Sequence, residues 1–242
     1  MTPFELLSPK IQKKIWNMRW ESFTPIQDRA IPAIINGDMD VILSSGTASG
    51  KTEAAFLPIL SLIEEEGPKY VKVIYISPLK ALINNQFERI VSLCEFTNIP
   101  INRWHGDVSY SQKKKFLQNP AGILQITPES LESLFLNRTN HLPYIFHHVN
   151  YIVIDEIHAF LDEARGIHLH SLLCRMQQYT KRRPRIIGLS ATIDNFPLAK
   201  KWVNPANPEK VLVIDTPGND KDLLYSLMHF SKDENGKKPL DL

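Results

Sequence analysis

The chain has 242 residues, of which 43% are hydrophobic and 22% are charged, and its formal net charge is +2. This length suits one large domain or two small ones, with ample chain for a buried core. A net charge this small gives no argument for nucleic acid by itself. No apolar run approaches the length of a membrane span, and the first residues lack the basic start and apolar core of a signal peptide. We therefore expect no membrane partner and a cytoplasmic location.

The two cysteines, Cys94 and Cys174, lie far apart in apolar stretches that have a helical spacing. Structural disulfides are rare in the cytosol, where thiols stay reduced. We expect two packed thiols in a cytosolic protein.

Two helices are predicted before residue 40. The first begins at Ser8, a good N-cap residue that is followed by proline, and its apolar residues keep a helical spacing to about Trp20. The second begins at Thr24 and ends near Gly37, a natural helix stop. Gln27 stands three residues after Thr24, so its side chain can bond back to the Thr24 N–H in a capping box. On local sequence alone, the cap is the better interpretation of Gln27.

The stretch from Val41 to Thr52 runs from an apolar segment through a loop of small residues to a helix-compatible segment. This order of strand, loop and helix is typical of a phosphate-binding P-loop. Small residues let backbone N–H groups surround phosphate oxygens, and the N-terminus of the next helix faces the same anion. Lys51 would reach the β- and γ-phosphates, and the Thr52 hydroxyl would bind Mg²⁺. The alternative is an ordinary strand-to-helix turn, because Ser45 stands where the strict pattern has glycine.

Further apolar runs predict buried strands at residues 71–77, 99–104, 123–126, 151–154, 186–189 and 211–214. Helical patterns lie between several of them, including one around residues 169–177. Strands that alternate with helices predict right-handed βαβ units, and hence an α/β fold with a mostly parallel sheet covered by helices on both faces. Ligands of such sheets bind at the carboxyl ends of the strands. Nearly every polar motif of this chain lies at such an end.

Asp155 and Glu156 directly follow the apolar run 151–154. Phosphoryl transfer to water needs held phosphates, a held metal ion and an oriented water. Asp155 has the position of an aspartate that holds the metal ion, and Glu156 can accept the proton of the attacking water. Because Lys51 also lies at a strand end, these residues together indicate a nucleotide hydrolase. The alternative is that Asp155 and Glu156 cap the following helix.

Several short motifs, taken together, resemble those of the superfamily 2 helicases. Motifs I, II and III of that family are similar to Gly50-Lys51-Thr52, Asp155-Glu156-Ile157-His158 and Ser190-Ala191-Thr192. Motifs Ia and Ib and the turn between them are similar to Ser77–Leu82, Thr127–Leu131 and His105-Gly106-Asp107. The adenine-reading Q motif resembles Thr24–Gln27. The combination of His158 with Arg165–Leu169 looks most like the Lhr-like DExH helicases. The resemblance covers about residues 4–214.

The resemblance implies a RecA-like P-loop NTPase fold, with ATP and Mg²⁺ as cofactors and DNA or RNA as the partner. The implied catalytic residues are Lys51, Asp155, Glu156 and His158, with Thr52 and Asp155 at the metal ion. The implied nucleotide-binding residues are Phe4, Gln27, Gly46, Thr47, Ala48, Ser49, Gly50, Lys51 and Thr52, with Phe4 placed against the adenine. Ser190 and Thr192, with His158, would couple the nucleotide state to the nucleic-acid surface. One strand would be contacted by Pro78, Leu79, Lys80, Gly106, Thr127 and Pro128, through backbone contacts that do not read sequence.

The family also has features that this chain lacks. Ala48 stands where the family usually has glycine, and Ser45 where it usually has alanine. The second RecA-like lobe of these helicases supplies arginine fingers, worth ~10³–10⁵ in rate, but no Gln-x-x-Gly-Arg-x-x-Arg motif is present here. We expect residues 1–215 to be the first lobe of a longer helicase, and residues 216–242 an extension or the start of a linker. Such a chain should be monomeric, bind nucleotide weakly and hydrolyse it slowly.

Two other functions fit the same motifs. One is a nucleotide-gated clamp that binds nucleic acid without unwinding it, and the other is a scaffold that no longer hydrolyses ATP. Intact Lys51, Asp155 and Glu156 argue against the scaffold. The choice between DNA and RNA stays open, because these backbone contacts do not reveal whether a 2′-hydroxyl group is recognised.

Overall fold

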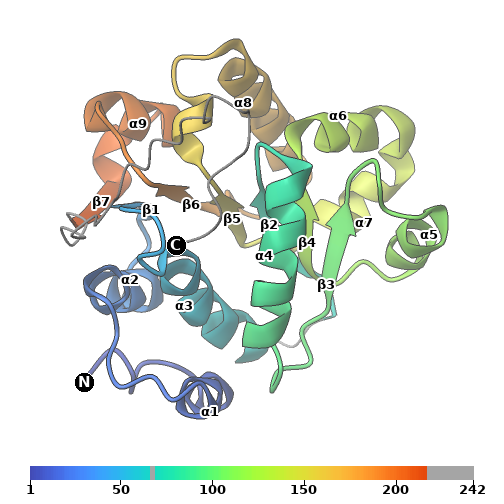
Figure 1. Ribbon diagram of the computed structural model, residues 1–242. Helices are drawn as coiled ribbons and strands as arrows, with labels where there is room; N and C mark the ends of the chain where they lie inside the picture. Colours follow the sequence, from blue (N-terminus) through green and yellow to red (C-terminus); the bar gives the residue numbers. More distant parts are fainter. Residues whose placement is uncertain (66–68, 217–242) are drawn as a thin grey trace, which may run out of the picture.

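The computed structural model describes residues 1–65 and 69–216, so residues 217–242 of the predicted extension lie outside the described residues. The strands are β1 (Asp40–Ser45), β2 (Val71–Ile76), β3 (Ile101–Trp104), β4 (Gly122–Ile126), β5 (Tyr151–Ile154), β6 (Arg185–Ser190) and β7 (Val211–Thr216). They form one sheet with the order β3-β4-β2-β5-β6-β1-β7, and every neighbouring pair is parallel (Figure 1). The predicted α/β fold with a parallel central sheet is confirmed.

Helices cover both faces of this sheet (Figure 1). One face carries α1 (Pro9–Asn17), α2 (Pro25–Asn36), α3 (Lys51–Glu65) and α4 (Lys80–Leu93). The other face carries α6 (Pro128–Asn137), α7 (Leu142–Phe146), α8 (Ala164–Gln177) and α9 (Phe196–Val203). Helix α5 (Tyr110–Gln118) lies beside β3, with the rings of Phe116 and Trp104 in contact. The 3-10 turns are η1 (Thr139–His141), η2 (Ile157–Phe160) and η3 (Pro208–Lys210).

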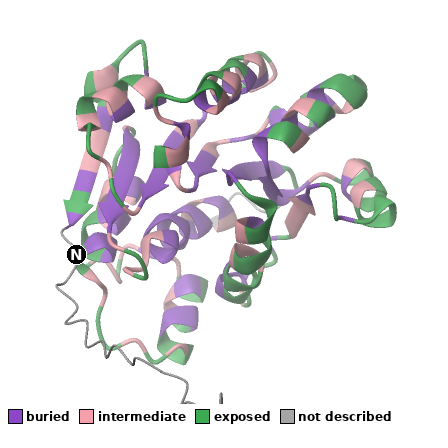
Figure 2. Ribbon diagram, turned by 45° about the horizontal axis from the view of Figure 1, so that its top comes forward, coloured by how far each residue is buried: buried purple, intermediate pink, exposed green. Residues whose placement is uncertain are grey.

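The central strands are buried on both faces, which explains their continuous apolar sequences. Val41 and Leu43 of β1 pack into the core between the sheet and α1–α4, whereas Ile42 between them packs into the core on the opposite side. Successive side chains of a strand point to opposite faces, so a strand covered on both sides needs apolar residues at every position. Figure 2 shows these buried strands between helices whose exposed sides face outward.

The parallel register brings the carboxyl ends of the strands to one edge of the sheet. Ile76 of β2 pairs with Ile126 of β4 and Ile154 of β5, and Ser44 of β1 pairs with Ser190 of β6. The loops that leave these strands carry the predicted motifs, so the motifs gather at this edge. The amino ends of the strands form the opposite edge, about 20 Å away for a strand of six residues.

The prediction of two packed thiols is correct for Cys94, which is buried, and wrong for Cys174, which is exposed; both thiols are free. The buried side of α8 is formed by Gly166, Leu169, Leu172, Leu173 and Met176. Position 174 falls outside this stripe in a helix with 3.6 residues per turn. Helix α8 also begins at Ala164, earlier than the predicted residues 169–177. Among the described helices, none has the length and apolar character needed to cross a membrane.

Candidate nucleotide-binding and nucleic-acid site

The P-loop connects β1 to α3 at the carboxyl edge of the sheet. Gly50 has a φ of 86°, and a Cβ atom added there would lie 2.3 Å from Nε2 of Gln27. Position 50 therefore offers neither the backbone conformation nor the space for a side chain. Ala48 has a φ of 58°, in the left-handed region that glycine adopts more easily. This conformation explains why the superfamily 2 helicases, whose motifs this chain resembles, usually have glycine at the position of Ala48.

Lys51 is turned back onto the loop. Its Nζ donates to the backbone oxygens of Ser45 and Gly46, at 2.6 and 2.8 Å. Burial lowers the pKa of this ammonium group, and the nearby carboxylates of Glu156 and Asp155 act in the opposite direction. Charge-assisted bonds to phosphate are stronger than bonds to neutral carbonyls, so a bound phosphate would be the better partner for Lys51.

The start of α2 is fastened to the P-loop by its two motif residues. Oε1 of Gln27 accepts from the Thr24 N–H at 3.0 Å, so the predicted capping bond is present. Nε2 of the same side chain approaches the Gly50 oxygen at 3.3 Å, and the Thr24 hydroxyl donates to the Ser49 oxygen at 2.9 Å. Phe4 is half-buried and packs against the core under α1–α4. Contacts of Gln27 and Phe4 with adenine remain predictions.

Asp155 lies at the end of β5, where its side chain is 7% exposed. Its Oδ2 accepts a hydrogen bond from the hydroxyl of Tyr75 at 2.5 Å, and its Oδ1 accepts from the Glu156 N–H at 3.1 Å. Burial raises the pKa of Asp155, and Glu156 raises it further, while the bond from Tyr75 opposes this shift. Sequence reasoning missed Tyr75, because it lies among apolar residues of β2 and looks like a core residue.

The donors around Lys51 fit a magnesium nucleotide. Mg²⁺ is usually held by one or two carboxylates, phosphate oxygens and waters, and Thr52 and Asp155 are both nearly buried beside the P-loop lysine. Within residues 1–65 and 69–216, no group of three His, Cys, Asp or Glu side chains forms an all-protein metal cage. The hydroxyl of Ser49 in the P-loop is buried, and within the described residues it has no hydrogen-bond partner. The loop thus holds an unused hydroxyl, which a phosphate oxygen would satisfy.

Glu156 and His158 occupy an unusual turn directly after β5. Glu156 has a φ of 48°, a left-handed conformation that is costly for a residue with a Cβ atom and is typical of functional sites. Its Oε2 lies 3.3 Å from Nδ1 of His158. The same Nδ1 is 2.9 Å from the hydroxyl of Ser190. Because that hydroxyl donates its proton to the Thr192 oxygen at 2.7 Å, His158 must supply the proton from Nδ1.

The hydrogen bond between His158 and Ser190 joins the predicted motifs II and III, which come from neighbouring strands β5 and β6. Thr192 takes part through its backbone oxygen, and its side chain is exposed. One imidazole ring thus lies between the Glu156 carboxylate and the end of β6. The structure brings the predicted coupling residues together.

The predicted strand-contacting residues lie at the ends of β2, β3 and β4. Leu79 and Lys80 are exposed, and the Lys80 ammonium pairs with the Asp107 carboxylate at 2.9 Å. A Cβ atom added at Gly106 would meet nothing within 4 Å. The fold itself therefore sets no steric limit at position 106. The open space beside Gly106 leaves room for another molecule to approach its backbone.

The other three predicted contacts are less accessible. Thr127 is 7% exposed and its hydroxyl accepts from the Ser130 N–H, as an N-cap of α6. Pro128 is buried as the first residue of that helix. Pro78 is buried, and its backbone oxygen accepts from Arg165 at 2.5 Å. Arg165, which also pairs with Glu129 of α6, thus links the ends of β2 and β4.

Comparison with known proteins identifies the family. A family model described as DEAD/DEAH box helicase matches residues 24–199. The ATP-dependent helicase Lhr-Core of Sulfolobus acidocaldarius is 33% identical over 228 residues, which cover 86% of this chain and 25% of that protein. The Lhr helicase/probable uracil glycosylase of Mycolicibacterium smegmatis is 32% identical, over 70% of this chain and 12% of that protein. The chain therefore spans a quarter or less of the length of these relatives.

Solved structures give the same result. The Mycobacterium smegmatis helicase Lhr bound to ssDNA and AMP-PNP matches with a TM-score of 0.77 and 26% identity, over 90% of this chain and 29% of that one. The DEAD-box helicase Mss116 bound to ssRNA and UDP-BeF matches with a TM-score of 0.77 and 22% identity, over 89% of this chain and 45% of that one. The second likeness shows the RecA-like fold alone. The Lhr-like resemblance is confirmed, and the chain belongs to the DEAD/DEAH box helicase family.

Proposed function

We propose that this chain is the first motor lobe of an ATP-dependent helicase or translocase. It would bind Mg²⁺-ATP at the P-loop and the backbone of a single strand of DNA or RNA at the neighbouring loops. The observation that carries this proposal is the meeting of Lys51, Asp155 and Glu156 at one edge of the sheet, with His158 bonded onward to Ser190. Such an arrangement can bind a nucleotide and report its state to the next strand.

The chain's own residues would have separate tasks. Lys51 would exchange its two carbonyl partners for phosphate oxygens, and the N–H groups between Gly46 and Gly50 would surround the same phosphates. Thr52 and Asp155 would hold Mg²⁺, which when bound neutralises charge on the phosphate oxygens. Glu156 would orient the attacking water and accept its proton.

The strand would cross the ends of β3, β4 and β2. Lys80 would pair with a phosphate in place of Asp107, and Gly106 would let the backbone of the strand approach closely. A solved relative that is 26% identical, the helicase Lhr of Mycobacterium smegmatis, is described as bound to ssDNA and AMP-PNP, which supports both ligands. Unwinding would need more of the motor, since the relatives carry about four times this length of chain or more.

A second RecA-like lobe would complete the motor. In this family such a lobe supplies arginine fingers, which are worth ~10³–10⁵ in rate. The described residues contain a single RecA-like sheet. We therefore expect the chain to bind nucleotide and to hydrolyse it near the background rate, with or without nucleic acid.

The test is to measure nucleotide affinity and steady-state hydrolysis for the chain, with and without single-stranded DNA and RNA. Lys51→Ala should abolish nucleotide binding, whereas Glu156→Gln should retain it. Lys201→Ala removes an exposed lysine from α9 and serves as the matched control. Unchanged affinity in Lys51→Ala would overturn the assignment of the P-loop, and rapid hydrolysis by the monomer would overturn the need for a second lobe.

A further inference from the structure

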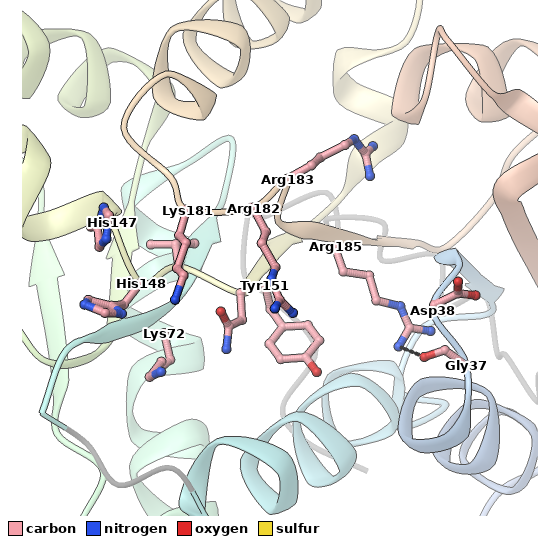
Figure 3. Close-up of a pocket in the computed structure, with 12 residues that line it drawn as sticks. Gly37, Asp38, Lys72, His147, His148, Tyr151, Lys181, Arg182, Arg183 and Arg185 are labelled. Carbon is pink, nitrogen blue, oxygen red and sulfur yellow. Dashed lines mark hydrogen bonds between the residues drawn. The ribbon is translucent and has the colours of Figure 1, made fainter.

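A basic cavity of about 480 Å³ lies at the amino-terminal edge of the sheet, opposite the P-loop (Figure 3). It spans the starts of four neighbouring strands in the order β2, β5, β6 and β1. Its lining includes one aspartate, Asp38, two histidines, His147 and His148, and five cationic side chains: Lys72, Lys181, Arg182, Arg183 and Arg185. The chain as a whole has a net charge of only +2. Positive charge is therefore concentrated at this edge, which attracts anions.

Two of the arginines have structural tasks. Arg183 pairs with the buried carboxylate of Asp40 at 2.9 Å, and Figure 3 shows its side chain pointing away from the rest of the group. Arg185 donates to the backbone oxygens of Ala33, Ile34 and Gly37 at the end of α2. Those oxygens are neutral acceptors, so the positive charge of Arg185 stays at the cavity.

Lys181 and Arg182 differ from these two arginines, because their side chains do not hold any other part of the described fold in place. Both are exposed, and within the described part of the chain neither side chain forms an ion pair or a hydrogen bond. Figure 3 shows Lys181 extending toward Lys72 and Arg182 extending toward Tyr151. Neither cation has a carboxylate partner among residues 1–65 and 69–216. A bound anion would supply the ionic partner that both side chains lack.

The backbone around these cations is rigidly fastened. The Lys181 N–H donates to the His147 oxygen at 3.0 Å, and the Asn150 N–H donates to the Lys72 oxygen at 2.9 Å. The Arg185 N–H donates to the Asn150 oxygen at 2.8 Å. These bonds join three segments into one frame: the turn that carries Lys181 and Arg182, the segment after α7, and the start of β2. A preformed frame lowers the entropic cost of binding.

An aromatic cavity of about 370 Å³ adjoins the basic one, and the two share His147 and His148. Tyr144, which is 72% exposed, and Tyr70 line it together with Pro120 and Pro143. Tyr70 stacks on His148 with ring centroids 3.9 Å apart. Exposed rings beside a row of cations are the combination that binds single-stranded nucleic acid, because phosphates pair with the cations and bases stack on the rings.

We propose that this amino-terminal edge is a second binding site for single-stranded nucleic acid. Successive phosphates of the strand pair with Lys181 and Arg182, and a base stacks on Tyr144. Three spacings of about 4.8 Å separate the four strand starts, so the cavity is wide enough for more than one phosphate. An acidic peptide would use the cations but would leave the aromatic cavity empty. The site needs neither bound nucleotide nor the motif loops, so it does not rest on the function proposed above.

The test is the affinity of the chain for fluorescent oligo(dT) and oligo(U), measured by anisotropy at several salt concentrations. Lys181→Ala/Arg182→Ala should weaken binding about ten-fold. The negative slope of log K against log salt should become shallower by about 1.4, which corresponds to two lost phosphate contacts on a single strand. Lys201→Ala/Lys210→Ala removes the same charge from exposed positions outside both cavities and is the matched control. It should change affinity less than two-fold.

The stacking contact has its own pair of variants. Tyr144→Ala should weaken binding by about ten-fold or more, whereas Tyr144→Phe keeps the ring and should bind like the parent chain. Ultraviolet cross-linking should attach the oligonucleotide to a peptide that contains Tyr144 or Tyr70. A loss of affinity that is equal in Tyr144→Ala and Tyr144→Phe would overturn the stacking role.

Lys80→Ala separates this inference from the proposed function. If Lys80→Ala weakens binding while the Lys181/Arg182 double variant binds like its control, the strand uses only the motif edge and the second site is overturned. If each variant weakens binding and their combination weakens it further than either alone, both sites stand. Polyglutamate that competes as well as oligo(dT) would assign the cavity to an acidic protein partner and would also overturn the inference.

Discussion

Tyr75 donates a hydrogen bond of 2.5 Å from its hydroxyl group to Oδ2 of Asp155, the residue that directly follows the neighbouring strand β5. Burial, together with the charge of Asp155, raises the pKa of Tyr75 well above its ordinary value, so the phenol keeps its proton and remains a donor. Within the described part of the chain, the Tyr75 hydroxyl forms no hydrogen bond to the P-loop, but it sets the orientation of the carboxylate that would hold Mg²⁺. It is a positioning residue that the motif pattern does not reveal.

Tyr75→Phe should weaken binding of the magnesium nucleotide by about 10-fold. This is the lower end of the loss expected when a residue that binds a metal ion loses a hydrogen-bond partner. The phenylalanine ring keeps the packing against Phe56, whose centroid lies 6.0 Å away. Affinity for a fluorescent ATP analogue is measured with Mg²⁺ and with EDTA. The loss should occur only with Mg²⁺, and Tyr110→Phe, at an exposed position on α5, is the control. An equal loss in EDTA would show that the effect is structural.

Asp155→Asn should stabilise the fold while removing Mg²⁺-dependent nucleotide binding. Burial raises the pKa of Asp155, so the folded chain holds this proton more tightly than the unfolded chain. The carboxyl group's contribution to the free energy of unfolding is therefore full below its unfolded pKa and is lost as pH rises through its folded pKa. At neutral pH the free energy of unfolding of the variant should be about 1 kcal/mol higher than that of the parent chain. A gain of this size is common when a stabilising substitution replaces a functional residue.

Urea denaturation at several pH values, without nucleotide, tests this expectation. The advantage of Asp155→Asn should shrink as the solution is acidified, because the parent carboxyl group then becomes neutral as well. Asp194→Asn removes an exposed carboxylate from the loop before α9 and should change little. A variant less stable than the parent chain at neutral pH would contradict this account of Asp155.

Ser190→Ala should uncouple the two ligands without preventing either from binding. His158 Nδ1 would lose its acceptor, and the path from the Glu156 turn to β6 would be broken. Oligonucleotide affinity is measured with and without a non-hydrolysable ATP analogue, and the ratio should fall toward 1 in the variant. Ser171→Ala, on the exposed side of α8, should keep the parent ratio. A ratio equal to that of the parent chain would remove the coupling role of His158 and Ser190.

Gly106→Ala should leave stability unchanged and weaken binding of single strands several-fold. A Cβ atom at this position meets nothing in the protein, so a lost affinity must come from a clash with the ligand. Gly50→Ala is the contrasting variant, since its Cβ would collide with Gln27 and its φ is positive. That variant should lose nucleotide binding. Thermal unfolding and fluorescence anisotropy measure both properties, and unchanged oligonucleotide affinity in Gly106→Ala would remove this contact from the proposal.

The two thiols should differ sharply in reactivity. Burial raises the pKa of Cys94 to about 12, so almost no thiolate forms there near neutral pH. Cys174 is exposed. A thiol reagent should therefore modify one group quickly in the folded chain and the second only in denaturant. Cys174→Ser should remove the fast phase, and a fast phase that remains in this variant would show that Cys94 is accessible through local opening.

Local sequence patterns predicted most of the secondary structure. Strands buried on both faces carry apolar residues at every position, so β1, β2 and β5 stand out as continuous runs. Helices α7 and α9 were not predicted, although a signal for α9 exists. Asn195 is its N-cap, accepting from the Leu198 N–H at 2.9 Å, and Pro197 follows in the first turn. The same combination of cap and proline marks the start of α6.

The sequence by itself determined the fold class and most residues of the candidate site, because glycines, capping residues and charged residues at strand ends have local physical causes. Only the tertiary structure decided which strands are neighbours. The order β3-β4-β2-β5-β6-β1-β7 places Tyr75 beside Asp155 and brings Lys72, His147 and Lys181 to one cavity. These contacts join residues that are distant in the chain. Their energies depend on burial and on the partners across the sheet, which no local pattern contains.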